Sequence, residues 1–342
     1  VILWAGYAFS RDYTSPRGHM YTVEDVTRTL RTGTPGPDMK DMQPATCWAC
    51  KSPDVPRMMQ EVGIENFYKA AWSQYGNEIV NPIGCADCHD PATMNLTITR
   101  PALIEAFERR GEDIADATPQ EMRSLVCAQC HVEYYFKGDG KYLTFPWDGG
   151  FTMEAMEEYF DKAQYADWTH SVSKAPMLKA QHPDYELFSR GIHAASGVSC
   201  ADCHMPYMRE AGRKYSSHWV TSPMKHIQAS CRTCHAQEEK LLLERVKTVQ
   251  NNVFQLQRIA GMTIARAHEA IGKAGTAAKV NNEGLEKARE LVRHAQWFWD
   301  FIAAENSMGF HNPDQALNVL GRSIDLAHQA IDTANRAAGT HH

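Results

Sequence analysis

The ten cysteines of this 342-residue sequence fall into five C-x-x-C pairs, and in four of them a histidine directly follows the second cysteine. This is the attachment signature of c-type haem, because two thioether bonds hold the porphyrin while the adjacent histidine reaches the iron. Every cysteine belongs to a pair, so chance agreement is remote. The four haem motifs are Cys85/Cys88/His89, Cys127/Cys130/His131, Cys200/Cys203/His204 and Cys231/Cys234/His235.

Two other uses of paired cysteines fit the sequence less well. A zinc site would combine C-x-x-C units or follow one with a spaced histidine pair, and it gives no reason for a histidine directly after each pair. A disulfide scaffold is typical of short chains without a sizeable core, whereas this chain is long enough to bury one. Covalent haem is therefore the preferred interpretation.

The fifth pair, Cys47 and Cys50, is followed by Lys51 rather than by histidine. An amine binds iron only in its deprotonated form, which requires a buried and tuned environment. One interpretation is a degraded haem site, or a C-x-x-C pair without haem. The other is a haem with a different proximal ligand and therefore a different task.

The sequence holds enough histidines to give four haems a second axial ligand. Of its 16 histidines, four follow cysteine pairs and two, His341 and His342, end the chain, which leaves ten. Low-spin haems with two histidine ligands need four of these ten. Spacing alone does not choose among them.

Composition excludes several classes of protein. With 22% charged and 43% hydrophobic residues, the chain is typical of one large or two modest globular domains. The net charge of -6, with scattered Lys and Arg, gives no basic surface for nucleic acid. No run of about 18 apolar residues predicts a membrane span. Because the sequence begins at Val1 within what reads as folded material, we expect that an upstream segment has been lost.

All five motifs lie within residues 1–235, which we interpret as a pentahaem region. Turn-rich stretches near its start surround a helix predicted over 23–30, with Thr22 as the N-cap. Little alternation of strand type is present. Amphipathic helices are expected at 101–110 and 152–162, and one hairpin near 135–145.

Residues 236–342 differ, because apolar side chains recur there at steps of three and four. This period of about 3.5 residues predicts long helices with continuous apolar seams. Asn312 and Pro313 suit the N-cap and first turn of the third helix. The predicted fold class is mainly α, a haem-packed multihaem core with long C-terminal helices and little β structure, and a homodimer through this region is expected. The seams are Leu242/Val246/Val249/Val253/Leu256/Ala260, Leu285/Ala288/Val292/Ala295/Trp299/Ile302 and Leu317/Leu320/Ile324/Ala327/Ile331/Ala334.

The order and spacing of the motifs resemble those of a known family. A lysine-terminated C-W-x-C-K motif precedes four C-x-x-C-H motifs, and the third of these continues as C-H-V-E-Y-Y-F from Cys130 to Phe136. The combination is similar to the pentahaem cytochrome c nitrite reductases that form ammonium, over essentially the whole chain. The resemblance implies an enzyme with five covalently bound haems c that reduces nitrite with six electrons, with 1–235 as its catalytic region.

The resemblance assigns roles to individual residues. Lys51 is then the proximal ligand of the first haem, whose opposite face stays open for substrate. Arg31, Tyr134 and His182 match the active-site arginine, tyrosine and histidine of the family. The second to fifth haems would take as distal ligands His218, His19, His311 and His193, respectively. Ordinary polar or surface positions are then left for His170, His226, His268, His294 and His328.

A calcium site is implied beside these residues. Its ligands would be the Glu133 carboxylate, the main-chain oxygens of Tyr134 and Lys179, and the Gln181 side-chain oxygen. Oxygen ligands suit such a hard cation. Because Glu133 precedes Tyr134 and Gln181 precedes His182, one ion would fix both catalytic side chains.

The expected chemistry follows from these assignments. Nitrite would bind through nitrogen opposite Lys51, with Arg31 and His182 hydrogen-bonded to its oxygens. His182 is the best proton donor, because the unperturbed pKa of histidine lies nearest neutrality. Tyr134 could donate a hydrogen bond, a proton or an electron, and the sequence does not choose among these. The four bis-histidine haems have both axial positions filled and would conduct electrons.

The resemblance also implies a periplasmic location, since c-type haem is attached outside the cytoplasm. The electron donor would be a membrane-anchored tetrahaem quinol dehydrogenase or a soluble pentahaem cytochrome. Two other functions stay open. One is a non-enzymatic multihaem electron carrier whose Lys51 haem is six-coordinate and inert, and the other is a related enzyme that acts on hydroxylamine, sulfite or tetrathionate.

Overall fold

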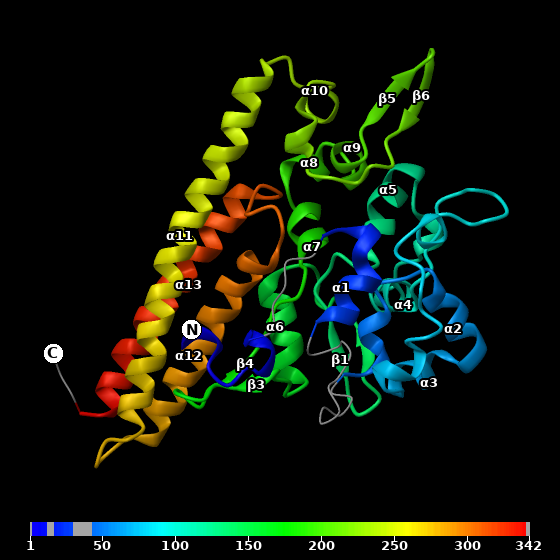
Figure 1. The fold of residues 1–342 in the computed structure, drawn as a ribbon. Coiled ribbons are helices and arrows are strands. Elements are labelled where there is room, and N and C mark those ends of the chain that lie inside the picture. The colour runs from blue at the N-terminus through cyan, green and yellow to red at the C-terminus, as the bar shows by residue number, and fades with distance from the viewer. Residues whose placement is uncertain (1, 12–16, 30–42, 340–342) are drawn as a thin grey trace. The chain divides into compact units, whose positions relative to one another are not determined.

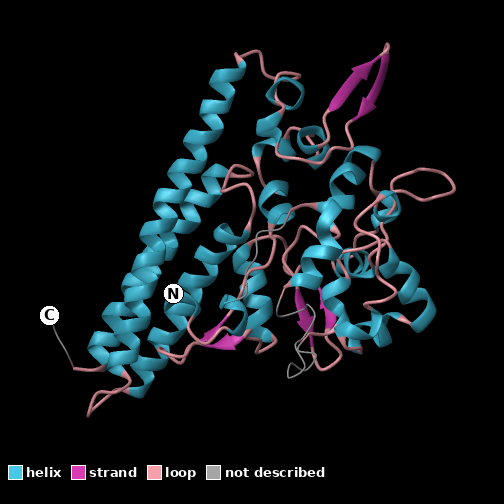
Figure 2. Ribbon diagram, viewed as in Figure 1, coloured by secondary structure: helices cyan, strands magenta, loops and turns pink. Residues whose placement is uncertain are grey.

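The computed structural model describes residues 2–11, 17–29 and 43–339, which form two compact units. The N-terminal unit is Ala8–Gly150, and the C-terminal unit is Val1–Tyr7 with Phe151–His342. Helices make up most of the C-terminal unit, whereas the N-terminal unit combines short helices with turns and loops (Figure 2). The strands of the described residues form three antiparallel two-stranded sheets. The predicted mainly α fold class is confirmed. The predicted boundary at residue 235 was drawn where the last haem motif ends and not from packing, and it stays a prediction.

The helices of the N-terminal unit are short and begin at recognisable sequence signals. Helix α5 (Pro119–Ala128) starts with a reciprocal cap, in which the Glu121 N–H donates to the Thr118 hydroxyl and the Thr118 N–H donates to the Glu121 carboxylate. The predicted hairpin is confirmed as β1 (Tyr135–Lys137) paired with β2 (Tyr142–Thr144). The other elements are η2 (Ala8–Arg11), η3 (His19–Tyr21), α1 (Thr22–Arg28), η4 (Ala45–Trp48), α2 (Asp54–Val62), α3 (Ile64–Lys69), η5 (Trp72–Tyr75), η6 (Cys85–Asp87), α4 (Pro101–Arg109) and η7 (Ile114–Asp116).

Helix α1 begins one residue before the predicted helix and ends at Arg28. Thr22 is its first helical residue, so the prediction of Thr22 as N-cap was wrong. The Thr22 hydroxyl is engaged elsewhere, since it donates to the Lys51 carbonyl oxygen at 2.7 Å. A tertiary hydrogen bond thus replaces the local cap and ties α1 to the lysine of the first motif.

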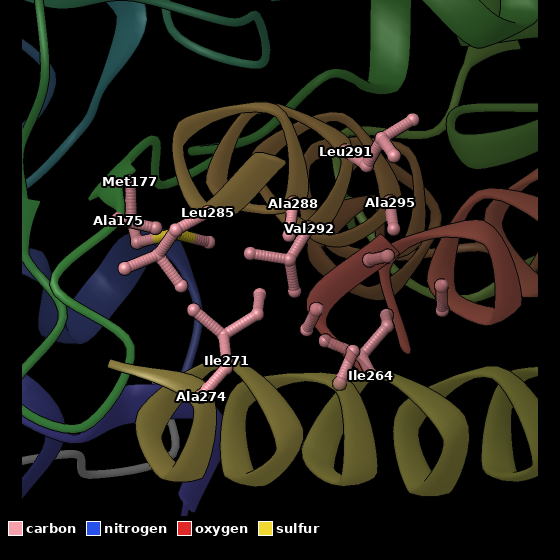
Figure 3. Packing of buried hydrophobic residues seen from close by; sticks show 14 of the residues in the cluster. Ala175, Met177, Ile264, Ile271, Ala274, Leu285, Ala288, Leu291, Val292 and Ala295 are labelled. Atoms are coloured by element: carbon pink, nitrogen blue, oxygen red, sulfur yellow. The ribbon is translucent and has the colours of Figure 1, made fainter. Parts of the chain in front are cut away.

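Three long helices dominate the C-terminal unit, and they coincide with the three predicted seams. Helices α11 (Glu239–Ala274), α12 (Asn282–Ala304) and α13 (Pro313–Ala337) lie side by side in Figure 1. In Figure 3, Ile264 and Ile271 of α11 point toward Leu285 and Val292 of α12. None of the helices in the described ranges is both long and apolar enough to cross a membrane.

Asparagine caps fix the starts of two of these helices. The Asn312 side chain accepts the Gln315 N–H at 3.3 Å, and Pro313 occupies the first turn of α13, as predicted. Asn281 caps α12 in the same way. An asparagine therefore sets the first turn of each of these two helices.

Helix α6 (Met153–Lys162) packs against α12. Trp297 Nε1 donates to the Met153 carbonyl oxygen at 2.8 Å, and the Trp297 ring lies edge-on to Phe160. Buried Arg293 joins the same two helices by donating to the Asp161 carboxylate at 2.8 Å. The remaining elements are η1 (Ile2–Trp4), β3 (Trp168–Thr169), β4 (Pro176–Met177), α7 (Asp184–Ser189), α8 (Ile192–Ala195), α9 (Cys200–His204), β5 (Tyr207–Glu210), β6 (Arg213–Ser216), η8 (Pro223–Lys225) and α10 (Ile227–Ser230).

Candidate functional site

Aromatic packing fixes the first cysteine pair and Lys51. Trp48, which lies between the two cysteines, is fully buried and stacks on Trp72 with ring centroids 4.6 Å apart. Its Nε1 donates to the Trp72 carbonyl oxygen at 3.0 Å. Lys51 follows this turn, and its N–H donates to the Trp48 carbonyl oxygen at 2.9 Å. The backbone of the half-buried lysine is thereby held in place.

A buried arginine links the first three motifs inside the N-terminal unit. Arg100 is 1% exposed and donates to the carbonyl oxygens of Ala49 and Ser52, at 2.8 and 2.9 Å, on either side of the second cysteine of the first motif. It also pairs with Asp87, which lies between the cysteines of the second motif. Gln129, between the cysteines of the third motif, accepts the Arg100 N–H and donates to the Asp87 carbonyl oxygen, both at 3.0 Å. One network therefore sets the relative positions of three haem motifs.

The first and third motifs also meet at their cysteines. The Cys50 and Cys130 thiols are close enough for each to shift the pKa of the other. The Cys130 thiol, with the positive charges of Lys51 and Arg100, lowers the pKa of Cys50 to about 7 against the effect of burial. Burial raises the pKa of Cys203, in the fourth motif, to about 12. The attachment cysteines thus differ in how readily they form the reactive thiolate.

Two of the predicted attachment cysteines, Cys85 and Cys234, are exposed, whereas the other eight are partly buried. The prediction that all ten cysteines attach haem concerns bonds rather than burial, and it stays a prediction. The motif of Cys234 lies between the four-residue helix α10 and the start of α11. The Cys234 N–H donates to the Cys231 carbonyl oxygen at 3.1 Å, which holds the turn. The thioether bond of Cys234 to haem stays a prediction.

The structure places the rings of three of the four predicted pairs of histidine ligands near one another. Two imidazoles that bind one metal through nitrogens at about 2 Å place their ring centroids about 6 Å apart. The separation within each pair is therefore the one expected for two imidazoles on one iron atom, and the ligation itself stays a prediction. The centroids lie 6.2, 6.3 and 6.4 Å apart in the pairs His19 with His131, His193 with His235, and His204 with His311, respectively.

Main-chain carbonyl groups orient two of the predicted proximal histidines. His89 Nδ1 lies 2.8 Å from the Met94 carbonyl oxygen, and His204 Nδ1 lies 3.1 Å from the Thr221 carbonyl oxygen. An acceptor at Nδ1 fixes the tautomer and leaves Nε2 for a metal. The fourth predicted pair joins His89 of the N-terminal unit to His218 of the C-terminal unit, and it stays a prediction.

The predicted catalytic residues are distributed over both units. Lys51 and Tyr134 lie in the N-terminal unit and His182 lies in the C-terminal unit, whereas Arg31 lies outside the described residues. Half-buried Tyr134 stacks on Phe136 with ring centroids 5.8 Å apart, directly before strand β1. The grouping of the four residues into one site stays a prediction.

A buried ion pair fixes the segment 179–182, which carries His182. Lys179 Nζ lies 3.0 Å from the Asp300 carboxylate, and the same carboxylate accepts the Ala180 N–H at 2.7 Å. The Lys179 N–H donates to Asp167 at 2.8 Å, and burial raises the pKa of that carboxyl to about 6. Sequence reasoning missed Asp300, although it is the one acidic residue within the apolar run 297–302 of α12.

The same segment holds two of the predicted calcium ligands. Gln181 Nε2 donates to the Lys179 carbonyl oxygen at 3.1 Å, so the side-chain amide and this main-chain oxygen are neighbours. The other two ligands, Glu133 and Tyr134, belong to the N-terminal unit, where the Glu133 carboxylate is 1% exposed. The complete ligand set stays a prediction.

Two histidines without a predicted role form a buried stack. The rings of His170 and His268 are nearly parallel, with centroids 3.6 Å apart. His268 Nδ1 lies 2.8 Å from Ser173 Oγ, and its Nε2 lies 2.8 Å from Gln296 Oε1. Burial, helped by the neighbouring His170, lowers the pKa of His268 to about 3. Both residues are thus neutral parts of the core and not surface histidines.

Known proteins share both the sequence and the fold. The profile of the family described as cytochrome c552 matches residues 1–342. The chain is 56% identical over 336 residues to cytochrome c-552 of Parabacteroides distasonis, covering 96% of this chain and 67% of that protein. It is 54% identical over 347 residues to cytochrome c-552 of Bacteroides fragilis, covering 100% and 69%, respectively.

A solved structure agrees over almost the whole chain. The cytochrome c nitrite reductase of Desulfovibrio desulfuricans, whose catalytic subunit NrfA has two calcium sites, superimposes with a TM-score of 0.94 at 40% identity. The match covers 99% of this chain and 75% of that one. With the profile match over its whole length and relatives more than half identical, this chain belongs to the cytochrome c552 family.

Proposed function

We propose that this protein reduces nitrite to ammonium. The observation that carries the proposal is the TM-score of 0.94 with the Desulfovibrio nitrite reductase. The sequence adds a C-x-x-C-K motif beside four C-x-x-C-H motifs, so one haem differs from the rest in its axial ligand. A chain with one unusual haem and four ordinary ones suits an enzyme that must deliver several electrons to a single site.

The proposed cofactors are five covalently bound haems c. Five cysteine pairs offer the thioether positions, and three histidine pairs have the ring separation that an iron atom requires. When bound, the haem held by Lys51 would supply the position for substrate, and the other four would supply a route for electrons. The assigned axial pairs are His89 with His218, His131 with His19, His204 with His311, and His235 with His193, in the order of the second to fifth motifs.

Four residues are proposed to serve the open haem. Lys51 supplies the proximal nitrogen. The chain is net negative, so anionic nitrite needs a locally positive site, which Arg31 and a protonated His182 would supply. His182 hydrogen-bonds a nitrite oxygen and holds the proton that is needed when the N–O bond breaks, because a histidine donates protons readily near neutral pH. Tyr134 supplies a hydroxyl at the same site.

A calcium ion is proposed to bind beside Tyr134 and His182. Its ligands are the Glu133 carboxylate, the main-chain oxygens of Tyr134 and Lys179, and the Gln181 side-chain oxygen. The burial of Glu133 and the contact between Gln181 and the Lys179 carbonyl group support this assignment. Oxygen donors of this kind suit calcium.

The protein is further proposed to act in the periplasm as a homodimer. It would receive electrons from a membrane-anchored tetrahaem quinol dehydrogenase or a soluble pentahaem cytochrome. The homodimer is supported by apolar side chains exposed on α11, among them Phe254, Ile259 and Met262. Exposed apolar residues along a long helix are typical of a protein interface.

An assay with reduced viologen and nitrite tests the proposed function. Protein loaded with all its haems should form one ammonium per nitrite and oxidise six viologen radicals. A Cys47→Ser/Cys50→Ser variant is the matched control, since it should keep four haems and form no ammonium. The proposal is contradicted if fully loaded wild-type protein passes electrons to other acceptors but forms no ammonium, as an electron carrier would.

A further inference from the structure

The loop between α12 and α13 is built around one buried carboxylate. Glu305 is 3% exposed, and it accepts the Ser307 N–H at 3.1 Å, the Ser307 hydroxyl at 2.7 Å and the Gly309 N–H. The Ser307 hydroxyl in turn accepts the His311 N–H at 2.8 Å. Hydrogen bonds to Glu305 therefore hold the loop that carries His311.

The same carboxylate reaches the His311 ring. Glu305 Oε2 lies 3.1 Å from His311 Nδ1. The other carboxylate nearby, Asp184, is 4.0 Å from Nδ1, and its two oxygens already accept the Asn306 N–H at 2.7 Å and the Asn306 amide at 2.8 Å. Nδ1 is buried and makes no aligned hydrogen bond in the structure, and Glu305 is the nearer of its two carboxylate neighbours, which leaves Nε2 for the iron between His311 and His204.

Neighbouring groups keep His311 from moving away from this contact. The backbone at Gly191 lies directly against the His311 carbonyl oxygen, so close that a Cβ atom at position 191 would be only 2.2 Å from it. The Phe188 ring stands edge-on to the His311 imidazole, with ring centroids 5.9 Å apart. Asn312 donates from its side chain to the Arg190 carbonyl oxygen at 2.9 Å. The ring is fixed on several sides.

A metal ion is the other ligand that two carboxylates and a histidine suggest. Asp184, Glu305 and His311 offer ligand atoms within 4.8 Å of one another. The carboxylates, however, already accept N–H and O–H donors from Asn306, Ser307 and Gly309. A hydrogen bond from the His311 Nδ1–H completes this set without displacing a donor, so the observations favour the hydrogen bond.

We propose that Glu305 is a positioning residue for the haem of the fourth motif. It accepts the Nδ1–H of His311, fixes the tautomer and the ring plane, and makes Nε2 a more electron-rich ligand. A more electron-rich axial nitrogen stabilises the ferric state, so the reduction potential of this haem is lowered. The inference rests on the proposed ligation of this haem by His204 and His311.

A redox titration of the haem-loaded protein, followed by electron paramagnetic resonance, tests this role. The component due to the His204/His311 haem is identified by its loss in a His311→Met variant. Glu305→Gln keeps the size of the side chain and removes its charge. It should favour reduction of that haem about tenfold, which is 59 mV for a one-electron couple, and should leave the haem low-spin.

The matched control is Glu157→Gln. Glu157 is also buried, and its Oε2 lies 2.8 Å from His294 Nδ1, but this histidine is not a proposed haem ligand. This variant should leave the potential of the His204/His311 haem unchanged. If Glu305→Gln does not take up its haems, Ser307→Ala provides the test, because it weakens the same loop and should shift the same potential upward by a smaller amount.

The outcomes separate the two proposals. An unchanged potential and unchanged signal in both loop variants would overturn the role of Glu305, whatever the enzyme reduces. A shifted potential in Glu305→Gln, together with haem-loaded wild type that forms no ammonium, would support the role of Glu305. It would overturn only the proposed reduction of nitrite. Equal shifts in Glu305→Gln and Glu157→Gln would also overturn the role, since they would show a general effect of charge.

Discussion

Asp300 holds the backbone just before His182, although it lies far from this segment in the sequence. The carboxylate binds both the Lys179 ammonium and the Ala180 N–H, just before His182 in the chain. We expect His182→Asn to lower the rate of nitrite turnover about 100-fold or more, because a proton donor at the breaking bond contributes that much. Haem content should not change. His328→Asn on the exposed face of α13 is the control, and an unaltered rate in His182→Asn would remove this residue from the mechanism.

The stacked pair of His170 and His268 makes stability depend on pH. The pKa of His268 is about 3 in the folded protein against an ordinary value of 6.5, so the unfolded chain takes up a proton first as the pH falls. Stability should therefore be complete above about pH 6.5 and should drop by about 2 kcal/mol at pH 5.

Chemical unfolding at several pH values, compared between wild type and His268→Gln, measures this effect. The neutral glutamine cannot titrate, so the variant should lose less stability on acidification than wild type does. Parallel pH profiles for the two proteins would show that His268 does not control the acid response.

The haem-attachment residues were predictable from the sequence, because covalent attachment fixes their spacing. Cysteine pairs followed by histidine or lysine lie within five consecutive residues, so the haem motifs can be found without the fold. Arg100, Glu305 and Asp300 could not be found in this way. Lys179 and Asp300, for example, are 121 residues apart, and only the folded chain brings them into contact.

At the scale of elements, Arg100 joins the turns that carry three haem motifs. Arg100→Met leaves the Asp87 carboxylate buried without its partner, which typically costs about 3 to 5 kcal/mol of unfolding free energy. Arg109→Met is the control, because the Arg109 pair with Asp148 is partly exposed and should cost no more than about 1 kcal/mol.

Denaturant unfolding and haem content of the two variants check this prediction. Adding Asp87→Asn to Arg100→Met should recover part of the loss, since the unpaired charge is then removed. Equal losses in Arg100→Met and Arg109→Met would show that the buried network has no special role in holding the motifs together.

The long helices were predictable because their apolar periodicity extends over many turns. Asn312 also indicates the start of α13 from the local sequence, because its side chain caps the helix by accepting the Gln315 N–H. The short helices and turns around the motifs have too few residues for a periodic pattern. At Thr22, the tertiary hydrogen bond to Lys51 overrode the local cap that the sequence suggested.

At the scale of the whole molecule, the proposed homodimer depends on the exposed face of α11. Met262→Glu places a charge where the side chain is 54% exposed in the single chain and would be buried in the dimer. We expect the dimer to dissociate at least about tenfold more readily, because a charge buried at an interface is costly.

Sedimentation analysis over a range of protein concentrations measures this change. Asn318→Glu, on an exposed position of α13, is the control and should leave the mass unchanged. A dimer that persists unaltered in Met262→Glu would move the interface away from α11.

The binding of nitrite to ferric, haem-loaded protein tests the central claim most directly, because that claim is a single open haem beside Lys51. Electron paramagnetic resonance should show one high-spin component per chain among low-spin haems, and one equivalent of nitrite should convert it. The Cys47→Ser/Cys50→Ser variant should lack this component and keep the low-spin signals. Five low-spin haems that do not respond to nitrite would contradict the account.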